Sequence, residues 1–427
     1  MTERETRTLP AFVWVAMIAA AVLQLVDVAA QFSSDRFGWL GMRAFLASNA
    51  MYLTVHIVVA MAAAHLGRRL TGVARLGARI AMWGLVLAIG FWAVRELYFA
   101  LGHVSEGTET IVLYIGWGLG LMVAIGLVLA ACRSTALMII GGVSMLFDNL
   151  PPVVWTSLWQ SASAAHIVDL IYGLTILLGM TGTVVLLYGA ARGAERPQPS
   201  LAIRGFRLAA RGVWLRVIAA IVAVCVTFMA AAATGGSGKG LAMALVAALV
   251  VNVASFWMFG IGAIQAACAN LDGLPRFVVG SAGVLSLWCG SLMFIQAPEL
   301  YSSLTGNAPS FGLDYLDPLS IAQPLIATLA AALFASAIAS FAYARGDTGL
   351  ARQARSAGVA FVGLTLFALV AQYALIQAAH STAGAVLVML VAAVCGLIAQ
   401  VALAQLCGAA SSSIDSEPTI PTAIVRP

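Results

Sequence analysis

The stretch TIVLYIGWGLGLMVAIGLVLAAC (110–132) contains 23 consecutive residues and not one charged side chain. An α-helix needs about 20 such residues to cross the hydrocarbon core of a bilayer. The composition extends this observation to the whole chain, because 62% of its 427 residues are hydrophobic and only 9% are charged. Soluble domains carry about 25% charged residues. The sequence therefore predicts an all-α polytopic membrane protein.

Apolar runs of spanning length recur along the chain, and together they predict twelve transmembrane helices. The runs are 10–32, 44–67, 80–101, 110–132, 136–160, 164–191, 213–234, 241–270, 277–297, 320–344, 356–380 and 384–409.

The distribution of basic residues supports twelve spans. With the N-terminus inside, 18 of the 22 basic residues fall on the inner side, Arg207 and Arg216 among them, and three fall outside. Such an excess marks the cytoplasmic side. The opening segment MTERETRTLPAFVW (1–14) carries acids and lacks the features of a signal peptide. We therefore expect both termini in the cytoplasm and the protein in a bacterial inner membrane.

Four segments follow from this topology. We expect a first six-helix half, a basic cytoplasmic linker, a second six-helix half and a disordered tail, at 1–195, 196–212, 213–410 and 411–427. The halves share short matches. RELYFAL (95–101) and PELYSSL (298–304) both contain E-L-Y-x-x-L near the end of a third helix. These matches favour a parallel internal repeat, with chance similarity of simple apolar helices as the alternative.

Charged and titratable residues within the predicted spans gather in the first half, whereas the spans of the second half offer only neutral polar residues. The candidate site residues are Asp27, His56, Arg95, Asp148 and Asp169, with Asn149 next to Asp148. From a rise of 1.5 Å per residue, Asp27, Arg95 and Asp169 are expected at a similar level. They predict a charge network, unless Arg95 extends outward to the interface.

The segment SMLFDNLPPVVW (144–155) places two prolines inside a predicted span. Proline lacks a backbone donor and disfavours helix at the preceding residue. Asp148 and Asn149 stand just before the prolines, and Asn149 could cap a second half-helix. A helix broken next to a polar residue is how many transporters build a substrate site. A simple kink, with Asp148 protonated or paired, is the alternative.

The sequence gives no support for several other chemistries. The single lysine, Lys239, is not in a helix core where a retinal Schiff base would need it. No histidine pair suits a haem, and no spacing matches a metal site. The net charge of +5 is explained by topology and needs no nucleic acid. We therefore expect no cofactor, no metal and no nucleic-acid partner.

The six-plus-six layout is similar to that of the major facilitator superfamily. The segment HLGRRLTGVARLGAR (65–79), however, lacks the acidic-then-basic glycine motif of that family. No residue role is therefore transferred from it.

These features favour a secondary transporter or permease for a small solute, coupled to protons through Asp148. The expected partners are the lipid bilayer, a small solute and protons. Two alternatives stay open. One is a non-catalytic membrane subunit that packs on other protein subunits. The other is an intramembrane acid/base enzyme that uses His56 or His166.

Overall fold

The computed structural model describes most of the chain. The described residues are 18–19, 22, 34–100, 106–132, 134–152, 154, 165–191, 199–233, 238–269, 271–305, 318–377 and 382–415. All elements in this part are helices: α2 (Ser34–Arg69), α3 (Gly72–Ala100), α4 (Glu106–Ala130), α5 (Thr135–Asp148), α7 (Ala165–Ala191), α8 (Pro199–Ala233), α9 (Gly238–Cys268), α10 (Arg276–Thr305), α11 (Pro318–Ala344), α12 (Thr348–Gln377) and α13 (Thr382–Asp415).

Nine helices in this described part are long and apolar enough to cross a membrane. Their apolar segments are 49–69, 72–95, 111–130, 174–191, 248–268, 276–295, 322–344, 348–370 and 394–415. Each overlaps a predicted span, so the prediction of a polytopic helical membrane protein is confirmed. The total of twelve spans, the repeat and the placement of the termini stay predictions.

The other three predicted spans have different outcomes. The first, 10–32, lies almost wholly outside the described residues. The fifth, 136–160, is interrupted, as the broken-helix alternative predicted, because α5 has 14 residues and ends at Asp148. The seventh, 213–234, is part of α8, whose 35 residues start at Pro199.

Two predicted boundaries can be compared with helix ends. The predicted linker, 196–212, is helical from Pro199 onward, because α8 runs without interruption through its basic residues. The predicted disordered tail, 411–427, is helical as far as Asp415, where α13 ends. The remainder of that tail lies outside the described residues.

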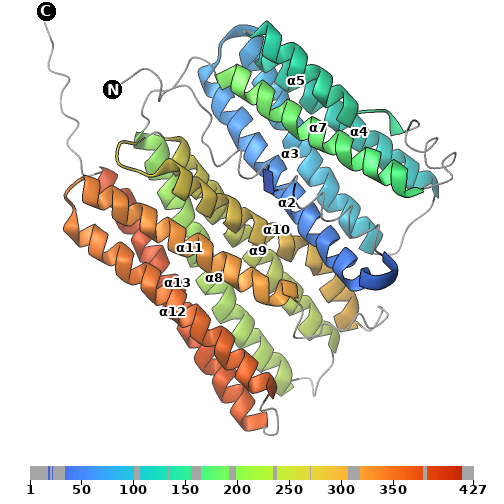
Figure 1. Cartoon of the computed structure of the whole chain (residues 1–427). Coiled ribbons are helices and arrows are strands. Elements are labelled where there is room, and N and C mark those ends of the chain that lie inside the picture. Colours follow the sequence, from blue (N-terminus) through green and yellow to red (C-terminus); the bar gives the residue numbers. More distant parts are fainter. Residues whose placement is uncertain are drawn as a thin grey trace, which may run out of the picture. The chain divides into compact units, whose positions relative to one another are not determined.

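The chain divides into two compact units, which we describe separately. One unit holds residues 1–196, 222–253 and 287–323. Within it, α3 packs on both α2 and α4, and α5 packs on α7 (Figure 1). Its core includes a buried hydrogen bond of 3.2 Å between the hydroxyl groups of Thr54 in α2 and Ser291 in α10.

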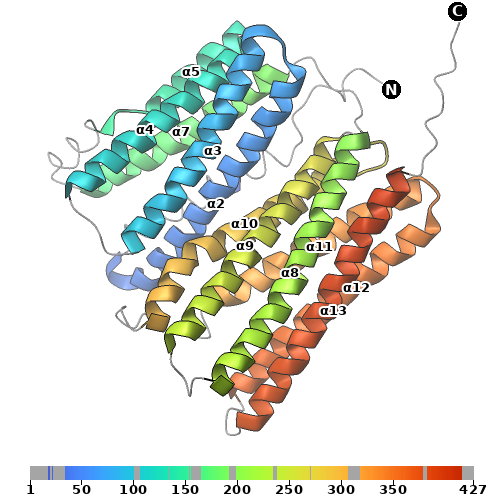
Figure 2. The ribbon, with the colours of Figure 1, turned by 180° about the vertical axis from the view of Figure 1, so that it is seen from behind.

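The second unit holds residues 197–221, 254–286 and 324–427. Here α12 packs along α13 (Figure 2). The ring of Phe334 in α11 lies between those of Phe206 and Phe259, with centroid distances of 5.9 and 4.9 Å. Between α8 and α9 the backbones nearly touch, because a Cβ atom at Gly205 would lie 2.5 Å from the Gly262 carbonyl oxygen. Small residues allow such close helix packing in membranes.

Candidate functional site

The end of α5 is set by its sequence. The backbone N–H of Asn149 donates to the Met145 carbonyl over 3.1 Å, and Asn149 then leaves the helical region with φ −99° and ψ 37°. Pro151 and Pro152 follow, and neither can donate the hydrogen bonds that a continuing helix needs. The helix therefore ends at Asp148, inside a segment predicted to span the membrane.

The Asp148 side chain packs directly on a glycine of the neighbouring helix α7. A Cβ atom at Gly179 would collide with the Cβ, Cγ and Oδ2 atoms of Asp148. Only glycine therefore allows α7 to approach the carboxyl group so closely.

The next residue, Asn149, packs on a second glycine, Gly120 in α4. The Asn149 Oδ1 atom lies where a Cβ atom at Gly120 would be. The indole N–H of Trp117, one turn earlier in α4, donates to the Asn149 backbone carbonyl over 2.9 Å. The Asn149 amide also donates to the Met145 carbonyl over 2.9 Å. Helices α4 and α7 thus both contact the chain at the break.

Close packing continues along α5 toward its start. A Cβ atom at Gly182 would lie 2.7 Å from the Gly141 carbonyl oxygen. Thr183 also places its hydroxyl 3.8 Å from the Met145 sulfur. These contacts fix α5 against α7 over about two turns, so the position of Asp148 is set by helix backbones rather than by a loop.

The Asp148 carboxyl has an unusual environment. It is half-buried, and no residue in the part of the chain that the structure describes forms a hydrogen bond or ion pair with it. A carboxylate within a membrane segment is unfavourable without a partner, and such residues commonly mark substrate or proton pathways. The group can therefore bind a proton, a cation or a hydrogen-bond donor.

Asn149 adjoins Asp148, whereas His56 and Arg95 lie on other helices, α2 and α3. His56 in α2 contacts Tyr52, with its Nδ1 atom 2.8 Å from the Tyr52 carbonyl and the two rings 4.3 Å apart. Arg95 is half-buried in α3. Asp27 and the side chain of Asp169 lie outside the described residues, so the predicted charge network stays a prediction.

One charged residue was not recognised as a site residue from the sequence. Arg216 in α8 was counted with the inner loops, yet its side chain is only 9% exposed. Its contacts include those with Ser255, Phe256 and Gln400. The interpretation that the second half has only neutral polar residues within its spans is therefore wrong. A signal was present, because Arg216 lies inside the predicted span 213–234.

No metal site is formed by the described part of the chain, where no group of three His, Cys, Asp or Glu side chains comes together. No protein family, curated protein or solved structure matches this chain.

Proposed function

We propose that this membrane protein is a secondary transporter, or permease, for a small solute, and that Asp148 is its substrate-binding or proton-coupling group. The observation that carries the proposal is the half-buried Asp148 carboxyl at the end of α5, packed on Gly179 and next to Pro151. Transporters commonly place a polar group at a broken helix near the middle of the membrane.

The local structure suits a cycle of proton binding. In an enclosed site the neutral, protonated carboxyl is favoured, because a charged carboxylate would lose its hydration. Opening of the site to water would favour loss of the proton. The break after Asp148 gives α5 a point at which its end can move, since no helical hydrogen bond continues through Pro151 and Pro152. Asp27, Arg95 and Asp169 would form a charge network on the outer side.

Transport is tested in proteoliposomes that contain the full-length chain. Solute-driven charge movement is recorded on a supported membrane for a panel of amino acids, carboxylates, sugars and amines. We expect Asp148→Asn to reduce the response to the active solute at least about tenfold, because a carboxamide can neither bind a proton nor carry charge.

The matched control is Asp415→Asn, which makes the same chemical change at the exposed end of α13. This control should transport as the unmodified chain does. A response that persists in Asp148→Asn would remove Asp148 from the mechanism. A chain that responds to no solute in the panel would contradict the transporter assignment.

A further inference from the structure

Two exposed arginines lie one turn apart near the start of α12. Arg352 and Arg355 are the fifth and eighth residues of this helix, and both side chains are exposed. Residues three apart on a helix are neighbours, with their Cβ atoms about 5–6 Å apart. The predicted topology places the start of α12 on the cytoplasmic side of the membrane. One face of the helix therefore carries two guanidinium groups at this side.

An aromatic side chain of α11 contacts the second arginine. The guanidinium carbon of Arg355 lies 4.7 Å from the centre of the Tyr343 ring, which belongs to the last turn of α11. Tyr343 is itself exposed, as is common for tyrosines at a membrane interface. A ring against one face of a guanidinium group orients it and leaves its planar edge, with the N–H groups, for an anion.

The turn between α11 and α12 fixes this corner of the second unit. Gly346 has a φ of 75°, in the left-handed region that favours glycine. Asp347 accepts the Leu350 backbone N–H over 2.9 Å with one carboxylate oxygen and the Ser413 hydroxyl over 3.2 Å with the other. The acid of the turn thus binds α12 and α13. The segment 343–359 carries three arginines and this one aspartate, a formal charge of +2.

The arginine pair continues into an exposed apolar face of the same helix. Val359, Leu366 and Val370 are 74%, 45% and 67% exposed. At 3.6 residues per turn, these three and the two arginines fall within about 60° of one another around α12. From Arg355 to the end of α12 the helix rises about 33 Å, close to the ~30 Å of the hydrocarbon core. Arg352 lies about 4.5 Å further out, at the level of the headgroups.

We propose that Arg352 and Arg355 bind the phosphate of an anionic phospholipid such as phosphatidylglycerol, whose acyl chains lie along the apolar face of α12. Arginine forms charge-assisted hydrogen bonds with phosphate oxygens. A zwitterionic lipid suits the pair less, because its own ammonium group competes with the arginines for the phosphate. Each arginine near the membrane surface strengthens the binding of an anionic lipid about fivefold. The inference does not depend on the transport proposal.

Lipid binding is measured on the full-length chain, delipidated in a neutral detergent. Native mass spectrometry records the fraction of chains that carry one phosphatidylglycerol as this lipid is titrated. We expect Arg352→Gln and Arg355→Gln each to weaken the binding about fivefold, and the double variant to weaken it roughly twentyfold. Tyr343→Leu should weaken it about two- to fivefold, because Arg355 loses its aromatic contact. Phosphatidylcholine should bind the unmodified chain more weakly than phosphatidylglycerol does.

The control variant is Arg204→Gln, which removes an exposed arginine from α8 in the same unit. It should bind phosphatidylglycerol as the unmodified chain does. All the replaced side chains are exposed, so the variants should unfold at the same temperature as the unmodified chain in lipid-free detergent. This second measurement separates the loss of a lipid site from the loss of the fold.

Four results would overturn the assignment. Undiminished phosphatidylglycerol binding in the double variant would remove the site. An equal loss in Arg204→Gln would show that net charge alone attracts the lipid. Displacement of the bound lipid by inorganic phosphate at the same concentration would make a free anion the ligand. A dimer that the double variant dissociates would make a second copy of the chain the occupant of this face.

Discussion

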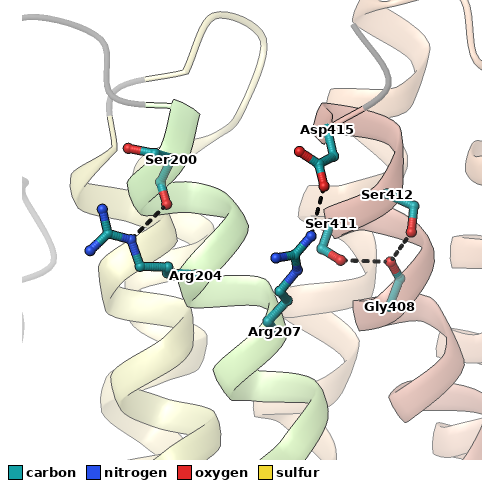
Figure 3. A network of polar contacts seen from close by, with 7 residues as sticks. All are labelled: Ser200, Arg204, Arg207, Gly408, Ser411, Ser412 and Asp415. Carbon is teal, nitrogen blue, oxygen red and sulfur yellow. Dashed lines mark hydrogen bonds and ion pairs between the residues drawn. The ribbon is translucent and has the colours of Figure 1, made fainter.

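The guanidinium group of Arg207 in α8 lies 2.7 Å from the carboxylate of Asp415 in the last turn of α13 (Figure 3). Nearby, the Ser411 and Ser412 hydroxyls donate to the Gly408 carbonyl, and Arg204 donates to the Ser200 carbonyl (Figure 3). The ion pair therefore joins the first third of α8 to the end of α13, two helices from distant parts of the sequence.

We expect this ion pair to contribute little to stability. Both side chains are more than half exposed, at 54% and 57%, and exposed ion pairs contribute about 0–1 kcal/mol. Asp415→Asn should lower the free energy of unfolding by less than about 1 kcal/mol, and the loss should shrink further in 1 M salt. Thermal unfolding in detergent, at low and high salt, checks this. A large, salt-independent loss would show that the pair is a structural contact that helix α13 requires.

The contact between Asp148 and Gly179 predicts a larger loss of stability when Gly179 is replaced. A methyl group at Gly179 would collide with the Asp148 Cβ atom, which cannot move without the α5 backbone. We expect Gly179→Ala to lower the free energy of unfolding by about 1–3 kcal/mol, the usual effect of overpacking, and to impair transport as well.

The control for this change is Gly118→Ala in α4. Gly118 is exposed, and a Cβ atom there would meet no atom within 4 Å. Alanine favours a helix over glycine, so this variant should gain about 0.5–1 kcal/mol. The two variants are compared by thermal unfolding in the same detergent. Equal midpoints for the two would show that α5 and α7 are not packed at Asp148 as described.

Thr54 and Ser291 offer a test of a buried polar contact between α2 and α10. Both side chains are fully buried, and their hydroxyl oxygens are 3.2 Å apart. A double-mutant cycle with Thr54→Val and Ser291→Ala, followed by thermal unfolding, should give a coupling energy of about 0.6 kcal/mol, as is typical of such bonds in membrane proteins. Strictly additive losses would show that the two hydroxyls do not interact.

Much of the fold follows from the sequence, because hydrophobic length alone defines a span. Nine of the predicted spans have their counterparts in the described helices, and the break before Pro151 follows from the chemistry of proline. The packing of Asp148 on Gly179 and of Asn149 on Gly120 could not be predicted, because a local sequence pattern does not show which helices pack on α5.

Arg216 shows a second reason why burial could not be predicted from the sequence alone. Its position near the start of a predicted span favoured the interpretation that its side chain lies at the membrane interface, because arginines near helix ends commonly extend to the headgroups. Only the position of α9 and α13 shows that this face of α8 is covered. The same reasoning applies to Gln400, which is one of several neutral polar residues in the sequence and gains its importance from its contact with Arg216.

The predicted orientation can be tested with Cys132, which lies two residues after the end of α4 and is exposed. With the N-terminus inside, α4 ends on the cytoplasmic side. A variant that keeps Cys132 and has alanine at the other five cysteines should therefore react with a membrane-impermeant maleimide in inside-out vesicles but not in intact spheroplasts. The control replaces Cys132 as well and should not be labelled in either preparation. Labelling in spheroplasts alone would place the end of α4 outside and reverse the predicted topology.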